Sequence, residues 1–156
     1  MIKKRINKLR SKFINYGIDG YVVPKNDEFF SEYSNKDRLK FISNFTGSAG
    51  YAVILKNRNY LFVDGRYTIQ SKIESGKDFK ILDYFKIINT SVFKNLNLGI
   101  DPSLFTTNKI QNFFLKNNKV TIIKENLVDK ISKIKSKKKS SFYSIDKSIT
   151  GESHHK

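Results

Sequence analysis

The fold is decided by residues 51–70, which read YAVILKNRNYLFVDGRYTIQ. Two apolar runs, residues 51–55 and residues 60–64, are rich in aliphatic and aromatic side chains and are typical of buried strands. The four polar residues between the two runs predict a tight turn, so the two strands should pair as an antiparallel hairpin. This hairpin is the starting point for the rest of the chain.

A helix is expected directly after the second strand of the hairpin. The chain turns at Gly65 and enters a pattern that places Ile69 and Ile73 on one helical face, and Gly76 follows as a stop signal. Because the strand leads through a short turn into a helix, this part of the sequence predicts the strand–turn–helix unit that α/β proteins repeat.

Helices and short apolar strands alternate along the remaining sequence. Helices are expected at residues 2–16, 36–42, 91–96 and 107–117, with one more after residue 125, and strands at residues 20–23, 79–82, 98–101 and 120–123. Interleaved elements favour a parallel arrangement, whereas the hairpin adds an antiparallel pair. The sequence therefore predicts an α/β fold in which a mixed β-sheet is flanked by helices.

Length and composition restrict the classes of protein to which the chain can belong. Its 156 residues suffice for one domain with one core, and thirteen Phe and eight Tyr exclude a disordered chain. No apolar run is long enough to cross a bilayer, so we expect no membrane association and a cytoplasmic location. The absence of cysteine excludes disulfides and thiolate metal sites.

The net charge of +16 would attract polyanions. However, 25 of the 30 basic residues are lysines, whereas surfaces that read bases usually depend on the arginine guanidinium. Specific nucleic-acid binding is therefore disfavoured. The basic, serine-containing run at residues 135–141 is interpreted as a solvated linker, with a nucleic-acid or membrane-surface tail as the alternative.

Side chains for catalysis are scarce in the sequence. The only two histidines are His154 and His155, so residues 1–150 offer no catalytic imidazole. Ser48 lies in a pattern similar to a nucleophile elbow, but Thr46 replaces the first glycine and no histidine is available to activate the hydroxyl. We interpret this segment as a glycine-rich turn and predict no catalytic residue.

Carboxylates do not form a recognisable metal-ligand set either. Asp27, Glu28 and Glu32 are close in sequence. However, the sequence does not supply two or three carboxylates at the ends of neighbouring strands together with a positioned histidine to complete a metal site. Asp64 follows an apolar strand directly, and we expect it to cap the helix that follows or to pair with an arginine such as Arg66. No metal site is predicted in this chain.

Several motifs together resemble the N-terminal, creatinase/prolidase-type domain of Xaa-Pro aminopeptidase (aminopeptidase P). The segments that carry the resemblance are residues 17–24 (GIDGYVVP), Asp27 with residues 31–33 (SEY), Arg38 with residues 41–50 (FISNFTGSAG), residues 63–67 (VDGRY) with Gln70, and residues 99–102 (GIDP) with Leu104 and Phe105. The resemblance covers about residues 6–130. At residues 127–132 the sequence departs from the family, which commonly has a tryptophan there.

The resemblance implies a domain organisation and a division of labour. Residues 1–130 would form the N-terminal domain, with a layout similar to ribonuclease H, and residues 131–156 a basic linker and the start of a truncated following segment. Peptide hydrolysis would belong to a missing C-terminal pita-bread domain that binds two divalent metal ions, expected to be manganese. We expect no cofactor and no activity in this chain alone.

The resemblance also implies a role in oligomer assembly and in gating the active site. The expected partners are the missing catalytic domain, further copies in a homo-oligomer and, in the full enzyme only, the peptide substrate. Asp64, Gly65, Arg66 and Tyr67 are the candidate substrate-gating or interface residues, with an internal packing and capping motif as the alternative. A stand-alone creatinase-like binding module and a weak basic nucleic-acid binder using residues 130–139 also stay open.

Overall fold

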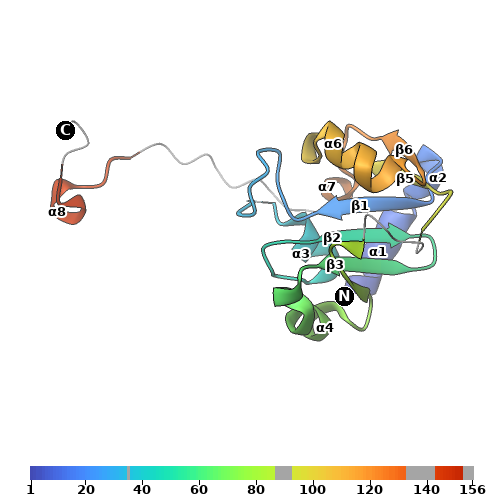
Figure 1. The fold of residues 1–156 in the computed structure, drawn as a ribbon, viewed down its shortest axis with the longest axis horizontal. Helices are drawn as coiled ribbons and strands as arrows, with labels where there is room; N and C mark the ends of the chain where they lie inside the picture. Colours follow the sequence, from blue (N-terminus) through green and yellow to red (C-terminus); the bar gives the residue numbers. More distant parts are fainter. Residues whose placement is uncertain (35, 87–92, 133–142, 153–156) are drawn as a thin grey trace.

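The computed structural model describes residues 1–34, 36–86, 93–132 and 143–152. Within them, a six-stranded sheet lies between helices (Figure 1). The strands are β1 (Gly20–Pro24), β2 (Tyr51–Leu55), β3 (Asn59–Val63), β4 (Lys80–Asp83), β5 (Asn97–Ile100) and β6 (Lys119–Ile122). The helices are α1 (Ile2–Arg10), α2 (Phe13–Tyr16), α3 (Arg38–Ser43), α4 (Thr68–Ser75), α6 (Thr107–Ile110), α7 (Leu127–Ile131) and α8 (Lys147–Thr150). The predicted mixed sheet flanked by helices is confirmed.

The strand order is β4-β3-β2-β1-β5-β6. The β2 strand runs antiparallel to both of its neighbours, with Val53 opposite Val22 of β1 and opposite Tyr60 of β3, whereas every other pairing is parallel. The carboxyl ends of β1, β3, β4, β5 and β6 therefore meet at one edge of the sheet, where β2 begins. We call it the carboxyl edge.

Two hydrophobic layers cover the two faces of the sheet. Successive side chains of a strand point to opposite faces, so Tyr21 and Val23 of β1 join one layer and Val22 joins the other. The first layer is completed by apolar residues of α1, α3 and α7, and the second by Phe105 and Phe114 around α6. Figure 1 shows α1 and α6 on opposite sides of the sheet.

The helix expected at residues 2–16 is interrupted in the structure. The α1 helix ends at Arg10 and α2 begins at Phe13, because the Lys12 N–H donates to the Leu9 carbonyl three residues back and tightens the turn. Phe13 is buried like Ile2, Ile6 and Leu9 before it, whereas the next apolar residue, Ile14, is exposed. Two short helices therefore replace the single helix expected at residues 2–16.

The α4 helix places Ile69 and Ile73 on one face, as expected, but that face points to solvent. The side chains that it buries are Ser71 and Ser75, and the Ser75 hydroxyl donates to the Ser43 carbonyl at 2.8 Å. Because serine is small, α4 can lie close to the end of α3. Apolar periodicity identified this helix correctly but did not identify its buried face.

Two other helices differ from the sequence prediction. Residues 93–96 are irregular, so the helix expected at residues 91–96 is wrong there, while residues 91 and 92 lie outside the described residues. The helix expected at residues 107–117 starts as α6 and continues as a wider π-helical turn, η3 (Gln111–Leu115). None of the helices in the described ranges is long and apolar enough to cross a bilayer.

Candidate functional site at the carboxyl edge

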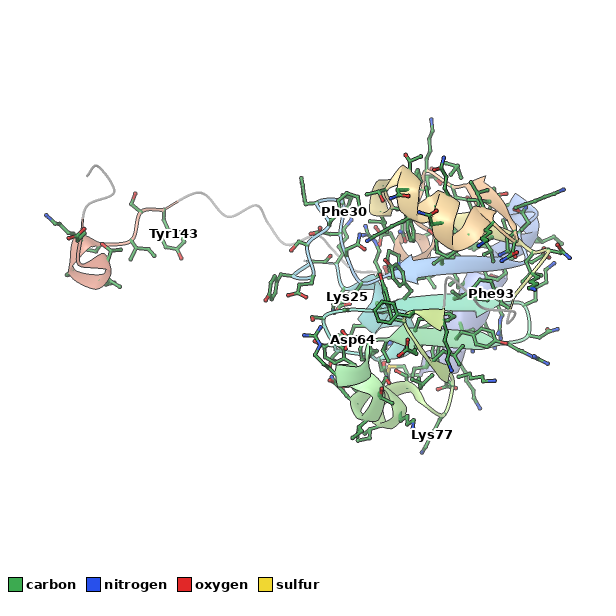
Figure 2. All side chains as sticks on the ribbon, viewed as in Figure 1. Lys25, Phe30, Asp64, Lys77, Phe93 and Tyr143 are labelled. Carbon is green, nitrogen blue, oxygen red and sulfur yellow. The ribbon has the colours of Figure 1, made fainter. Side chains whose placement is uncertain are left out.

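A cavity of about 350 Å³ opens at the carboxyl edge of the sheet. Its walls include Lys25, which follows β1, Gly50, which precedes β2, and Asp64, which follows β3. Figure 2 shows Lys25, Phe30 and Asp64 along the same side of the folded body. Open α/β sheets usually bind ligands just beyond the carboxyl ends of their strands, so this cavity is the candidate site.

Aromatic side chains form the inner wall of the cavity. The rings of Tyr51 and Tyr84 lie 5.3 Å apart, and the Tyr84 hydroxyl donates to the Tyr51 hydroxyl at 3.2 Å. Phe105 stacks on the other side of Tyr51, with ring centroids 6.2 Å apart. Burial raises the pKa of Tyr51, so its hydroxyl stays protonated at neutral pH. This wall can accept an apolar group but offers no base.

One of the two lysines in the cavity wall, Lys25, is already neutralised. The Lys25 side chain is buried, and its Nζ donates to Asp37 Oδ2 at 2.5 Å. The other carboxylate oxygen of Asp37 accepts from the Lys40 backbone N–H at 2.9 Å and so caps α3. The pair therefore connects the end of β1 to the start of α3. It leaves Glu32, Asp64 and Lys109 as the remaining charged residues of the wall.

The segment from Asp64 to Tyr67 begins at the cavity, because Asp64 is one of the residues that line it. Asp64 caps the short 3-10 helix η1 (Gly65–Tyr67): its Oδ1 accepts from the Arg66 backbone N–H at 2.9 Å, and its Oδ2 accepts from Arg66 Nη2 at 2.7 Å. Hydrogen bonding to Arg66 lowers the pKa of Asp64. The capping and arginine pairing predicted for Asp64 are confirmed. The guanidinium also lies over the Tyr67 ring, 5.3 Å from its centroid, and 74% of the Arg66 side chain is exposed.

The glycine-rich segment that precedes β2 packs against Tyr67 of this turn. Tyr67 packs edge-on against the buried ring of Phe45, at a centroid distance of 5.6 Å, and its hydroxyl is 2.8 Å from Ser48 Oγ. A Cβ atom on Gly47 would lie 2.2 Å from the Phe45 ring, so no larger residue fits without displacement. Ser48 therefore acts as a turn residue that holds Tyr67, in agreement with the sequence interpretation.

Sequence reasoning missed an ion-pair cluster that forms around the buried Arg38. Arg38 binds Asp129 of α7 through two hydrogen bonds of 2.9 Å, and its Nη2 also donates to Glu28 at 2.8 Å. Lys36 approaches Asp129 at 3.4 Å. We call these four residues the Arg38 cluster. Because 91 residues separate Arg38 from Asp129, no local pattern could have paired them.

The protonation states of the Arg38 cluster are fixed by its hydrogen bonds. Burial alone would lower the pKa of Arg38, but the bonds to Asp129 and Glu28 outweigh it and the pKa is raised. Burial would raise the pKa of Asp129, yet the bond from Arg38 keeps it below its ordinary value. One nitrogen, Arg38 Nη1, is buried and has no hydrogen-bond partner among the described residues.

The remaining candidate carboxylates do not converge. Asp27 accepts from the backbone N–H groups of Phe29 and Ser31 and so shapes a local turn, while Glu28 faces Arg38. In residues 1–34, 36–86, 93–132 and 143–152, no group of three or more His, Asp or Glu side chains could hold a metal ion. His154, His155 and the lysine run at residues 135–139 lie outside the described residues.

A family model describes almost the whole folded body of the chain. Residues 5–131 match the model for the creatinase/prolidase N-terminal domain. A probable Xaa-Pro aminopeptidase P from Laccaria bicolor is 32% identical over 97% of this chain and 26% of its own length. Xaa-Pro aminopeptidase 1 from Dictyostelium discoideum is 34% identical over 83% of this chain and 23% of its own length. The chain thus spans about a quarter of the length of these relatives.

Solved structures share the fold. An X-prolyl aminopeptidase from Caenorhabditis elegans, described as a cytosolic enzyme with a di-nuclear active site, superposes with a TM-score of 0.71 at 24% identity. That alignment covers 83% of this chain and 25% of the other. The N-terminal domain of the cytoplasmic peptidase PepQ from Mycobacterium tuberculosis superposes with a TM-score of 0.63 at 16% identity, over 83% of this chain and 98% of the other. A separately solved domain of this kind therefore has the same architecture.

Proposed function

Because the chain belongs to the creatinase/prolidase N-terminal domain family, we propose that it is the non-catalytic N-terminal domain of an Xaa-Pro aminopeptidase. In this proposal its carboxyl edge helps to enclose the active site, and the domain contributes to oligomer assembly. Hydrolysis, with the two divalent metal ions that we expect to be manganese, belongs to polypeptide outside the matched domain. The lengths of the relatives support this division, because the chain spans only about a quarter of each.

The observation that carries the gating role is the exposed guanidinium of Arg66, which is paired with Asp64 of the cavity wall. A guanidinium presents five N–H donors, and Asp64 engages only part of that set. The remaining donors face solvent on a side chain that Asp64 and the Tyr67 ring hold in place. Such a group is suited to bind a peptide carboxylate or a carboxylate of a neighbouring chain.

The aromatic wall of the cavity complements the charge of Arg66. Tyr51 is almost fully buried and Tyr84 partly so, whereas Phe85 remains exposed at the mouth of the cavity. An apolar peptide side chain that entered the cavity would displace water from these rings. The Arg66 guanidinium and the aromatic wall of the cavity can therefore together position a peptide beside a catalytic centre that a partner segment provides.

The first test asks whether the isolated chain has peptidase activity. The purified 156-residue protein is incubated with Xaa-Pro peptides, with and without added Mn²⁺, and the release of the N-terminal residue is measured. We expect no turnover above the metal-free blank, because the described residues provide neither a metal-ligand set nor an activated nucleophile. Turnover that depends on Mn²⁺ would contradict the proposed division of labour.

The second test addresses gating. The chain is joined to the part of the Laccaria bicolor relative that follows the matched segment, and peptide hydrolysis by this joined protein is compared with that of its Arg66→Ala variant. Loss of a charge-assisted hydrogen bond to substrate should lower kcat/KM about tenfold. Arg58→Ala is the matched control, because Arg58 is exposed in the hairpin turn at the opposite end of β2 and β3. Equal activities of the two variants would remove the gating role of Arg66.

A further inference from the structure

Four exposed aromatic side chains belong to two segments that line the cavity, and two of them, Phe30 and Phe85, are part of its wall. Phe29, Phe30 and Tyr33 come from the loop between β1 and α3, and Phe85 follows β4. They are 88%, 49%, 85% and 72% exposed, respectively. Single exposed apolar residues are ordinary, but several at one place mark an interaction surface. We call this set the aromatic rim.

The loop that carries most of the aromatic rim differs in charge from the rest of the chain. Residues 25–38 contain four acidic and three basic residues, a net charge of −1, although the whole chain carries +16. Three of these acidic residues, Glu28, Asp37 and Asp27, are held in the ion pairs and the turn described above. Protein interfaces are typically rich in aromatic residues and poor in lysine. This surface therefore fits a protein partner rather than a polyanion.

The loop is held in a defined conformation. Phe30 has a φ of 59°, in the left-handed region that a bulky residue rarely occupies and that costs about 1–2 kcal/mol. Asp27 stabilises this turn, since its carboxylate accepts from the N–H groups of Phe29 and Ser31. Asn26 connects the loop to the body by donating to the Leu104 carbonyl at 3.0 Å. Phe29 and Phe30 are thus presented by an ordered turn, which reduces the entropy lost on binding.

The Arg38 cluster connects this loop to the last helix of the folded body. Arg38 binds Glu28, the residue before Phe29, and at the same time binds Asp129 in α7. The α7 helix ends at Ile131, two residues after Asp129, so its end lies close in sequence to a residue that shares Arg38 with the loop. A segment attached to α7 would encounter the rim at a high effective concentration. A second, separate copy would gain no such advantage, because it is not tethered to α7.

We infer that the aromatic rim is the docking surface for the polypeptide that follows α7 in the longer relatives, and that the Arg38 cluster fixes the rim relative to the point where that polypeptide starts. The inference rests on the proposed function, because it assumes that a further part of an aminopeptidase follows this domain. It goes further by naming the contact surface, which is separate from the Arg66 side chain proposed to meet substrate.

The test uses the absence of cysteine from the chain. Phe29→Cys and Tyr33→Cys are made singly in the 156-residue chain and in the joined protein with the Laccaria bicolor segment, and maleimide labelling of each site is followed by peptide mass spectrometry. Ile14→Cys is the control, because Ile14 is 85% exposed on α2, which precedes β1 at the opposite edge of the sheet.

We expect all three cysteines to react quickly in the isolated chain. In the joined protein, labelling at positions 29 and 33 should slow about tenfold, as a docked population of about 90% requires, while labelling at position 14 stays fast. Equal labelling of positions 29 and 33 in the two proteins would overturn the inference. So would protection in the isolated chain that increases with protein concentration together with a doubled mass, because the occupant would then be a second copy.

The outcomes separate this inference from the proposed function. Protection of positions 29 and 33 that appears only when a proline-containing peptide is added would support gating and overturn docking. If Arg66→Ala lowers the activity of the joined protein while both cysteines remain reactive, the proposed function stands and the docking surface is wrong. Constitutive protection together with an Arg66→Ala variant of normal activity would support docking alone.

Discussion

Two arginines at the carboxyl edge bind carboxylates in very different surroundings. Arg38 is almost fully buried and joins Glu28 to Asp129, which are far apart in sequence, whereas Arg66 is largely exposed and pairs with Asp64 two residues away. A buried ion pair is costly to break because one charge is left without a partner, but an exposed pair contributes little. The first arginine therefore fixes the structure, while the second is free to interact with other molecules.

The largest effect is expected for Arg38→Ala. The substitution leaves Asp129 partly buried without its guanidinium partner and removes the hydrogen bonds through which one side chain joins α7 to Glu28. We expect the free energy of unfolding to fall by about 3 kcal/mol. Urea denaturation followed by circular dichroism measures this change. A loss as small as that of an exposed pair would show that the burial of Arg38 does not matter for stability.

A smaller effect on the free energy of unfolding is expected for a substitution in the glycine-rich turn that packs against Tyr67, the neighbour of Arg66. Gly47→Ala would push a methyl group into the Phe45 ring, which in turn supports Tyr67. Such overpacking should lower the free energy of unfolding by about 2 kcal/mol. Gly65→Ala is the matched control, since nothing lies within 4 Å of a Cβ added there. Equal melting temperatures of the two variants would argue that the turn adjusts without strain.

Acid should weaken the Arg38 cluster selectively. The pKa values of Asp129 and Glu28 are lowered in the folded chain, so their stabilising contribution is complete above the unfolded values near pH 4 and is lost as the pH falls through the folded values. The difference in unfolding free energy between the unmodified chain and Arg38→Ala should therefore be constant from pH 7 to about pH 5 and shrink below about pH 4. A difference that persists at about pH 2 would assign the effect to packing instead.

The smallest effect on stability is expected for Arg66→Ala. Its guanidinium is exposed and its ion pair with Asp64 is local, so thermal unfolding should not change measurably. The Asp64 cap persists, because the carboxylate also accepts from the backbone N–H of residue 66. Differential scanning calorimetry of this variant beside Arg38→Ala measures the contrast directly. Destabilisation comparable to that of Arg38→Ala would show that the turn is structural and would weaken its assignment to gating.

Local patterns in the sequence predicted much of this edge. The hairpin of β2 and β3, the turn at Gly65 and the cap at Asp64 all depend on neighbours within a few residues, so propensity and spacing suffice to identify them. The glycine-rich turn was interpreted correctly for the same reason, because the lack of a nearby histidine left Ser48 no chemical role.

Features that depend on distant contacts were not predictable in this way. The burial of Arg38 follows from Asp129, which folding brings back from the far end of the domain. The exposed isoleucines of α4 follow from close packing of its serines near α3, a contact that no periodicity encodes. The cavity is built from segments that follow three different strands, and single-sequence reasoning could not assemble it.

The two outermost strands of the sheet, β4 and β6, affect how the domain behaves at high concentration. Both are only four residues long and begin with an exposed lysine, Lys80 or Lys119. Short, positively charged margins of this kind discourage the sheets of two molecules from hydrogen-bonding to one another. The domain can therefore expose the aromatic rim at one end while its outer strands do not favour strand pairing between molecules into fibres.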